Sequence, residues 1–98
     1  MTEWLDFLQQ YQVGDFIEGT VIQHQQFGVF LDLNVPPILG LVRIVSFKNQ
    51  GPMSPELFPR IGTKVRGIIT DFNANDHQVN ISLKPIDFEK FSRKRGGF

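Results

Sequence analysis

Aromatic and basic side chains are the groups in this sequence with the clearest capacity for chemistry. The 98 residues include ten Phe, one Trp and one Tyr, so some rings must lie near the surface. A flat ring exposed on a sheet is a stacking platform for a nucleic-acid base. All ten Lys and Arg residues fall in residues 43–98, together with five acids, whereas residues 1–42 hold five acids and no base. The second half can therefore present one basic face. The formal net charge of zero instead favours the interpretation that these Lys and Arg side chains are only solvated and bind nothing.

The sequence shows no residue set with the spacing of a catalytic or metal centre. It has no cysteine, which removes disulfides, thiolate metal sites and thiol nucleophiles. His24 and His77 have no neighbour at metal-ligand spacing, and neither a serine nucleophile motif nor a glycine-rich phosphate loop occurs. Asp71 and Asp76 flank a turn and are interpreted as its caps. We therefore expect no enzymatic activity, no cofactor and no metal.

The sequence also bears on the compartment of the protein and on contact with a membrane. Residues 1–11 lack the basic start and apolar core of a secretory signal. No apolar run approaches the roughly 20 residues that cross a bilayer. These features, with the absence of cysteine, lead us to expect a cytoplasmic protein that does not contact a membrane.

The pattern of apolar and turn-forming residues predicts one small all-β domain. A short helix over residues 1–12, with Trp4, Leu5 and Leu8 on one face, is expected to pack on the barrel. Alternation predicts five strands, at residues 16–22, 27–33, 38–45, 64–72 and 78–83. The long connection between the third and fourth strands holds three prolines and predicts a helical turn at residues 54–58.

This arrangement is typical of an oligonucleotide/oligosaccharide-binding (OB) fold. We expect a five-stranded antiparallel OB-fold barrel over residues 13–85, with the short N-terminal helix before it and the helical turn between strands three and four. Closing the barrel removes exposed sheet edges, and a partly open sandwich of the same strands is the alternative. Residues 86–98 are expected to add a helical turn and then a basic, mobile C-terminal tail.

Several short motifs occur in order within the expected barrel. They are Val13-Gly14-Asp15, Phe27-Gly28-Val29-Phe30-Leu31-Asp32, Gly40-Leu41-Val42, Ile61-Gly62 and Val79-x-Ile81-Ser82-Leu83-Lys84. Together they resemble the S-one domain, the RNA-binding OB module named after the largest protein of the bacterial small ribosomal subunit. The resemblance covers about residues 13–85 and implies a bacterial protein of translation or RNA metabolism.

The resemblance implies an RNA-binding surface on the second and third strands. By position, the two aromatic residues that meet bases are Phe27 and Phe30, and the third-strand position that is usually histidine is Arg43. The turn before the last strand places Asn73 where the family usually has Asp and Gln78 where it usually has Arg. Gln78 lacks the guanidinium with which an arginine binds phosphate. Other Lys or Arg residues would therefore have to supply that phosphate contact.

The spacing of the two rings sets a structural condition. Phe27 and Phe30 are three apart, so strict alternation would place them on opposite faces of the strand. A kink or bulge at Gly28 would bring both rings to one surface.

Basic residues elsewhere could supply phosphate contacts. Lys64 and Arg66, with Lys84, are candidates if they flank the same face. The tail at residues 93–98 is the densest basic segment and could add contacts, or could only improve solubility.

Two functions from different classes remain open. The first is single-stranded RNA binding, with the ribosome or another RNA-associated protein as the expected partner. The second is a protein–protein interaction module, an adaptor or inhibitor, on the same fold. The zero net charge, the acidic first half and the absence of the turn arginine favour the second.

Overall fold

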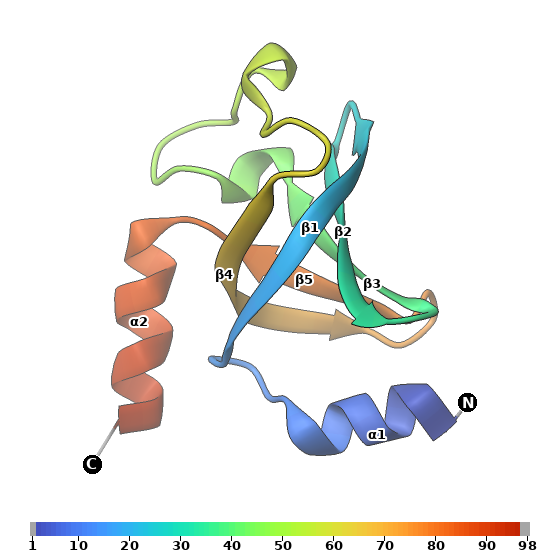
Figure 1. Cartoon of the computed structure of the whole chain (residues 1–98). Helices are drawn as coiled ribbons and strands as arrows, with labels where there is room; N and C mark the ends of the chain where they lie inside the picture. Colours follow the sequence, from blue (N-terminus) through green and yellow to red (C-terminus); the bar gives the residue numbers. More distant parts are fainter. Residues whose placement is uncertain (1, 97–98) are drawn as a thin grey trace.

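Five strands close into a barrel in the computed structural model, which describes residues 2–96 and the side chains of residues 3–90 (Figure 1). The strands are β1 (Phe16–Gln25), β2 (Gly28–Val35), β3 (Ile38–Arg43), β4 (Lys64–Asn73) and β5 (Gln78–Ser82). Around the barrel their order is β1-β2-β3-β5-β4, and β4 pairs with β1 to complete the ring. The all-β class and the OB-type barrel expected from the sequence are confirmed.

The expected antiparallel sheet was wrong in one pairing. β3 and β5 run parallel, with Leu39, Gly40 and Leu41 opposite Gln78, Val79 and Asn80. The other four pairings are antiparallel. A closed ring of five strands cannot alternate direction all the way round, because five is odd. One parallel pair is therefore a consequence of closing the barrel.

The strand ends differ from the sequence prediction by a few residues. β1 continues to Gln25, through the polar segment that was expected to end it, and its register shifts between Val21 and Gln23. Ile22 is thus the extra residue of a bulge, and this bulge bends the strand. β3 ends at Arg43, because residues Ile44–Ser46 form the short 3-10 helix η1. The expected helical turn between the third and fourth strands is η2 (Pro55–Leu57), with Ser54 at its N-cap position.

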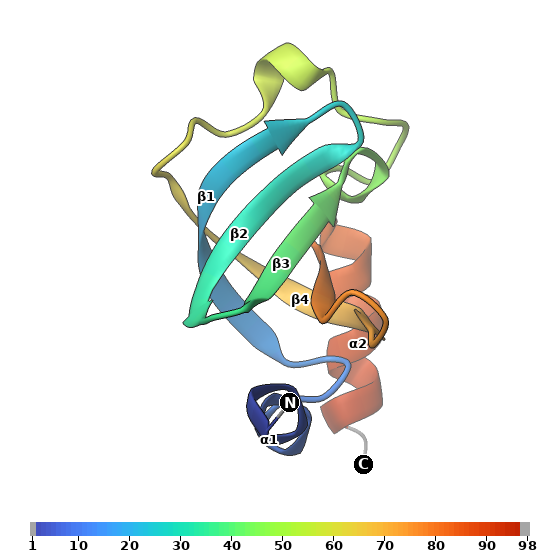
Figure 2. The ribbon, with the colours of Figure 1, turned by 90° about the vertical axis from the view of Figure 1, so that its right-hand side faces the viewer.

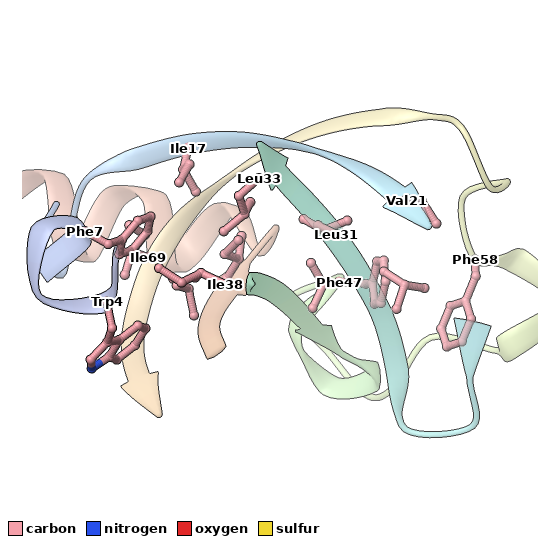
Figure 3. Packing of buried hydrophobic residues seen from close by; sticks show 14 residues of the cluster. Trp4, Phe7, Ile17, Val21, Leu31, Leu33, Ile38, Phe47, Phe58 and Ile69 are labelled. Carbon is pink, nitrogen blue, oxygen red and sulfur yellow. The ribbon is translucent and has the colours of Figure 1, made fainter. Parts of the chain in front are cut away.

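Alternating inward side chains fill the barrel. Val29, Leu31 and Leu33 of β2 are buried, and so are Val79 and Ile81 of β5. Figure 3 shows this cluster running along the barrel, with Trp4 and Phe7 at one end and Phe47 and Phe58 at the other. Both ends of the apolar interior are therefore closed by aromatic rings.

Helix α1 (Thr2–Gln10) lies below the barrel and closes its lower end (Figure 2). Trp4 and Phe7 are buried, and each ring packs edge-on against Phe72 of β4. The prediction that Leu5 and Leu8 share the buried face of this helix with Trp4 was wrong, because both leucines are exposed. The buried stripe follows the spacing of Trp4 and Phe7, one helical turn apart.

Helix α2 (Pro85–Gly96) stands along the outside of β4 (Figure 1). It is longer than the helical turn expected at residues 86–91 and occupies most of the segment expected to be a tail. Phe88 packs edge-on against Phe16, with ring centroids 5.3 Å apart, and Ile68 behind them is fully buried. The outer face of β1 and β4 at this end of the barrel is therefore covered. The basic side chains expected at residues 93–98 lie outside the described side chains.

A hydrogen bond from Ser82 fixes the start of α2. Ser82 is buried, and its Oγ donates to Asp87 Oδ2 over 2.7 Å while accepting from the backbone N–H of Lys84 over 3.1 Å. Ser82→Ala removes both bonds, so we expect the free energy of unfolding to fall by about 1–3 kcal/mol. Urea unfolding followed by circular dichroism measures the change. Ser54→Ala is the matched control, because the exposed Ser54 makes no capping bond; equal stability of the two variants would contradict this role.

Candidate nucleic-acid interface

Two phenylalanine rings meet outside the barrel, at the tip of the β1–β2 hairpin. The Phe27 side chain is 51% exposed, and Phe30 is partly exposed. Val29 and Leu31 on either side of Phe30 are fully buried, so the Phe30 side chain points outward. The two ring centroids are 5.9 Å apart with planes nearly perpendicular. The expectation that both rings reach one outer surface is confirmed.

Gly28 makes this meeting of the rings possible. Its φ is 156°, which side-chain-bearing residues rarely adopt, and Phe27 before it lies in the hairpin turn rather than in β2. A Cβ at this position would lie 2.2 Å from the carbonyl oxygen of Val42 and 2.9 Å from Arg43 Cα. The break in alternation expected at Gly28 is therefore the hairpin turn that ends there, since β2 pairs with β3 without a bulge from Gly28 to Asp32. The close approach of β3 adds a second requirement for glycine.

Leu41 and Arg43 of β3 continue the surface beside the rings. Leu41 pairs with Phe30 across the strands and is 9% exposed. It does not belong to the core cluster, so its side chain lies on the outer side of the sheet and adds apolar surface beside Phe30. Arg43 pairs with Gly28, and the N–H of the next residue, Ile44, donates to the Phe27 carbonyl over 2.7 Å. The Arg43 side chain is exposed. We call Phe27, Phe30, Leu41 and Arg43 the aromatic surface.

The sequence prediction missed Leu41 as part of this surface. The alternation of β3 contains the signal, since Gly40 and Val42 point inward and leave Leu41 and Arg43 on the outside. Leu41 is also opposite Asn80 of β5, so a polar amide extends the row that starts at Phe30.

Two carboxylates lie near the aromatic surface. Asp32 points outward two residues after Phe30, and its Oδ1 accepts a hydrogen bond from the Asn34 N–H over 2.9 Å. Asp71, which is exposed, pairs with Asn80 and lies at the far end of the row that starts at Phe30. Both groups repel phosphate, so they limit where a nucleic-acid backbone can run.

Asn73 and Gln78 lie at the β4–β5 turn, on the next outward row. Gln78 pairs with Asn73 on one side and with Leu39 on the other. The Asn73 side chain is engaged locally: its Nδ2 donates to Asp76 Oδ2 over 3.0 Å, and its Oδ1 accepts from the Asp76 N–H over 3.2 Å. Asn73 therefore stabilises the turn, and an RNA contact at either residue stays a prediction.

Lys64 and Arg66 are placed on the opposite side of β1 from β2. Lys64 pairs with Thr20, and Arg66 pairs with Glu18. The Arg66 guanidinium lies 4.3 Å from the centre of the Phe16 ring, on the face that α2 covers. The structure does not bring Arg66 to the aromatic surface, and Lys64 lies two strands from Asp32.

The described part of the chain holds neither a metal-ligand cluster nor a membrane-spanning helix. Across the described side chains, three or more His, Asp or Glu residues do not gather in a way that could hold a metal ion. Neither helix in the described part of the chain has the length and apolar character needed to span a bilayer.

The sequence belongs to the S1 RNA binding domain family. The profile of that family matches residues 10–84, which is most of the chain and all of the barrel. Small ribosomal subunit protein bS1 of Leuconostoc lactis is 27% identical over 94 residues, covering 96% of this chain and 22% of that protein. A 4-hydroxy-3-methylbut-2-enyl diphosphate reductase of Clostridium tetani is 30% identical over 86 residues, covering 86% of this chain and 13% of that protein. The chain thus spans about a fifth or less of these relatives.

Solved structures agree on the fold. A chain of the a/eIF2alpha–aDim2p–rRNA complex of Pyrococcus horikoshii superposes with a TM-score of 0.67 at 20% identity, over 88% of this chain and 51% of that one. GSP13 of Bacillus subtilis gives a TM-score of 0.65 at 20% identity, over 74% of this chain and 55% of that one. The family match thus gives the class of domain, and these structures support its barrel.

Proposed function

We propose that this domain binds single-stranded RNA through the aromatic surface, in translation or another part of RNA metabolism. The observation that supports it best is the pair of outward rings, Phe27 and Phe30, 5.9 Å apart beside the exposed Arg43. Exposed rings stack on bases of any type, and unpaired bases are free to stack on them. The relatives named for ribosomal proteins favour a cytoplasmic role near the ribosome or another RNA-associated protein. We propose binding without catalysis for this chain.

The charges near the rings predict a modest affinity. Arg43 is the cation closest in register to the rings, opposite Gly28, whereas Asp32 follows Phe30 by two residues. Few phosphates can be neutralised there, so stacking must supply most of the binding free energy. The logarithm of affinity should therefore fall with the logarithm of salt concentration with a slope of only about −0.7 to −1.4, equivalent to one or two phosphates.

The Arg43 contact gives a prediction of its own. We expect Arg43→Ala to weaken binding of a six-nucleotide oligo-U about five- to tenfold and to reduce the salt slope by about 0.7, because one phosphate contact is lost. Fluorescence anisotropy at several salt concentrations measures both quantities. Arg66→Ala is the matched control, since Arg66 lies against Phe16, and it should change affinity less than twofold. Equal losses in the two variants would argue against the assignment.

A protein-binding role is the second candidate, and the flanking carboxylates favour it. Asp71 lies opposite Asn80, in the same row as Leu41, and Asp32 lies in the neighbouring row, opposite Leu39. Gln78 carries no charge for phosphate. An apolar surface with few cations also suits a peptide or protein partner.

One titration separates the two functions. Labelled oligo-U and oligo-A are added to the protein at low and at moderate salt. Saturable binding that weakens as salt rises supports the RNA function. Absence of binding at low salt contradicts it and favours the protein partner, which a pull-down with and without nuclease would then test.

A further inference from the structure

An open groove lies next to the aromatic surface, between the β1–β2 hairpin tip and η2. Its volume is about 330 Å³, and it is lined by His24, Gln25, Gln26, Pro55 and Phe58. Figure 1 shows the η2 segment above the barrel, beside the end of the β1–β2 hairpin. Gln26 directly precedes Phe27, so the groove and the aromatic surface share the tip of the β1–β2 hairpin.

The groove walls are held in place by contacts at the barrel rim. His24 Nε2 lies 2.7 Å from the carbonyl oxygen of Pro59, and its ring packs edge-on against Phe58 with centroids 5.6 Å apart. Phe58 in turn stacks on Phe47 of the core. Since a carbonyl oxygen only accepts, Nε2 carries the proton, and in the neutral ring Nδ1 is left as an acceptor. The hairpin and the η2 segment are thus fixed against each other, and the groove is preformed.

The lining chemistry suits an uncharged, hydrogen-bonding ligand. Gln25 and Gln26 each offer an amide donor and an amide acceptor, and Pro55 and Phe58 offer apolar surface. The lining includes no Lys, Arg, Asp or Glu, so a phosphate would find no cation there. A base, with an apolar face and an edge of donors and acceptors, fits this set better than a sugar-phosphate group does.

We propose that this groove is a base-reading subsite that prefers adenine. The proposal rests on the proposed RNA function, because it places the next base of a strand that stacks on Phe30 and Phe27. A glutamine amide pairs in a bidentate manner with adenine, which presents an amino donor next to a ring-nitrogen acceptor. Uracil also presents a donor next to an acceptor, N3–H beside O4, but its single ring covers less of the apolar surface of Pro55 and Phe58 than the fused rings of adenine do. Phe27 and Phe30 then supply affinity for any base, while the glutamine amides hold one base in the groove and the apolar wall favours the larger purine there.

The test uses the full chain and a set of uridine six-mers in which adenine replaces one base at a time. We expect one adenine position to bind about tenfold more tightly than the all-uridine strand. In a Gln25→Ala/Gln26→Ala variant that advantage should disappear, while affinity for the all-uridine strand changes less than threefold. Gln9→Ala/Gln10→Ala, on the exposed face of α1, is the matched control and should retain the preference. Gln26→Ala alone serves as a second variant if the double variant does not fold.

The possible outcomes separate a failure of the adenine subsite from a failure of the RNA-binding function on which it rests. Equal binding of all six-mers, or a preference that survives in the Gln25/Gln26 variant, overturns the subsite and leaves the RNA function standing. Absence of binding to every six-mer overturns both proposals.

Discussion

Alanine at both Phe27 and Phe30 is expected to weaken binding of a six-nucleotide oligo-U by about 30-fold or more. Each ring that stacks on a base contributes roughly 1–3 kcal/mol, and the two rings lie on one surface with centroids 5.9 Å apart. Because the surface has few cations, little other binding free energy is available to compensate. Fluorescence anisotropy at low salt gives the dissociation constants of the unchanged protein and of the double variant.

A matched phenylalanine controls for a general effect on the fold. Phe88→Ala removes a partly buried ring that packs against Phe16 under α2, away from the aromatic surface. It should leave oligonucleotide affinity within twofold, although it destabilises the α2 contact. The fold of each variant is checked by circular dichroism. A folded Phe27→Ala/Phe30→Ala variant with unchanged affinity would reject the aromatic surface as the binding site.

Alanine at Gly28 is expected to lower the free energy of unfolding by about 2–5 kcal/mol. Two costs combine: an unfavourable φ of 156° for a residue with a side chain, and a Cβ placed 2.2 Å from the Val42 carbonyl oxygen. The clash is with backbone of the paired strand, so it cannot be relieved by rotating a side chain. Urea unfolding measures the loss, and the surviving folded fraction should also bind oligo-U more weakly because the hairpin tip must move.

Gly51→Ala separates the two costs at Gly28. Gly51 also has a positive φ, 74°, but a Cβ there has no neighbour within 4 Å. We therefore expect a loss of only about 1 kcal/mol at Gly51. Equal losses at the two glycines would mean that β3 does not constrain the hairpin tip.

The sequence was sufficient to predict the barrel but not all of its pairings. The alternation of Val79, Ile81 and Leu83 and the turn residues between segments predict strands directly, since both are local properties. Alternation within a strand carries no information on which strand lies beside it. The parallel pairing of β3 with β5 therefore became visible only when the ring was closed.

Helix α1 shows a different limit of sequence analysis. Leu5 and Phe7 are both apolar, and helical spacing alone allows a stripe through either. The choice depends on what the helix meets, which is the Phe72 ring and the His77 ring stacked 5.0 Å from Trp4. Packing against those distant residues buries Phe7 and leaves Leu5 in solvent.

The candidate site was predictable where it depends on local geometry. Gly28 between two aromatic residues indicated a break in alternation, and the structure has the end of a hairpin turn there, with a φ of 156° at Gly28. The position of Arg66 was not predictable, because the ring of Phe16 and helix α2 that flank it come from elsewhere in the chain. The groove at Gln25 and Gln26 was missed for the same reason, since its second wall belongs to the η2 segment.

Amide chemical shifts of the labelled protein during titration with oligo-U test most directly which side of the barrel meets RNA. We predict that the largest changes fall on Gly28, Phe30, Leu41 and Arg43, with little change along α2. Changes concentrated at Arg66 and Phe88 instead, or none at saturating oligonucleotide, would contradict the account.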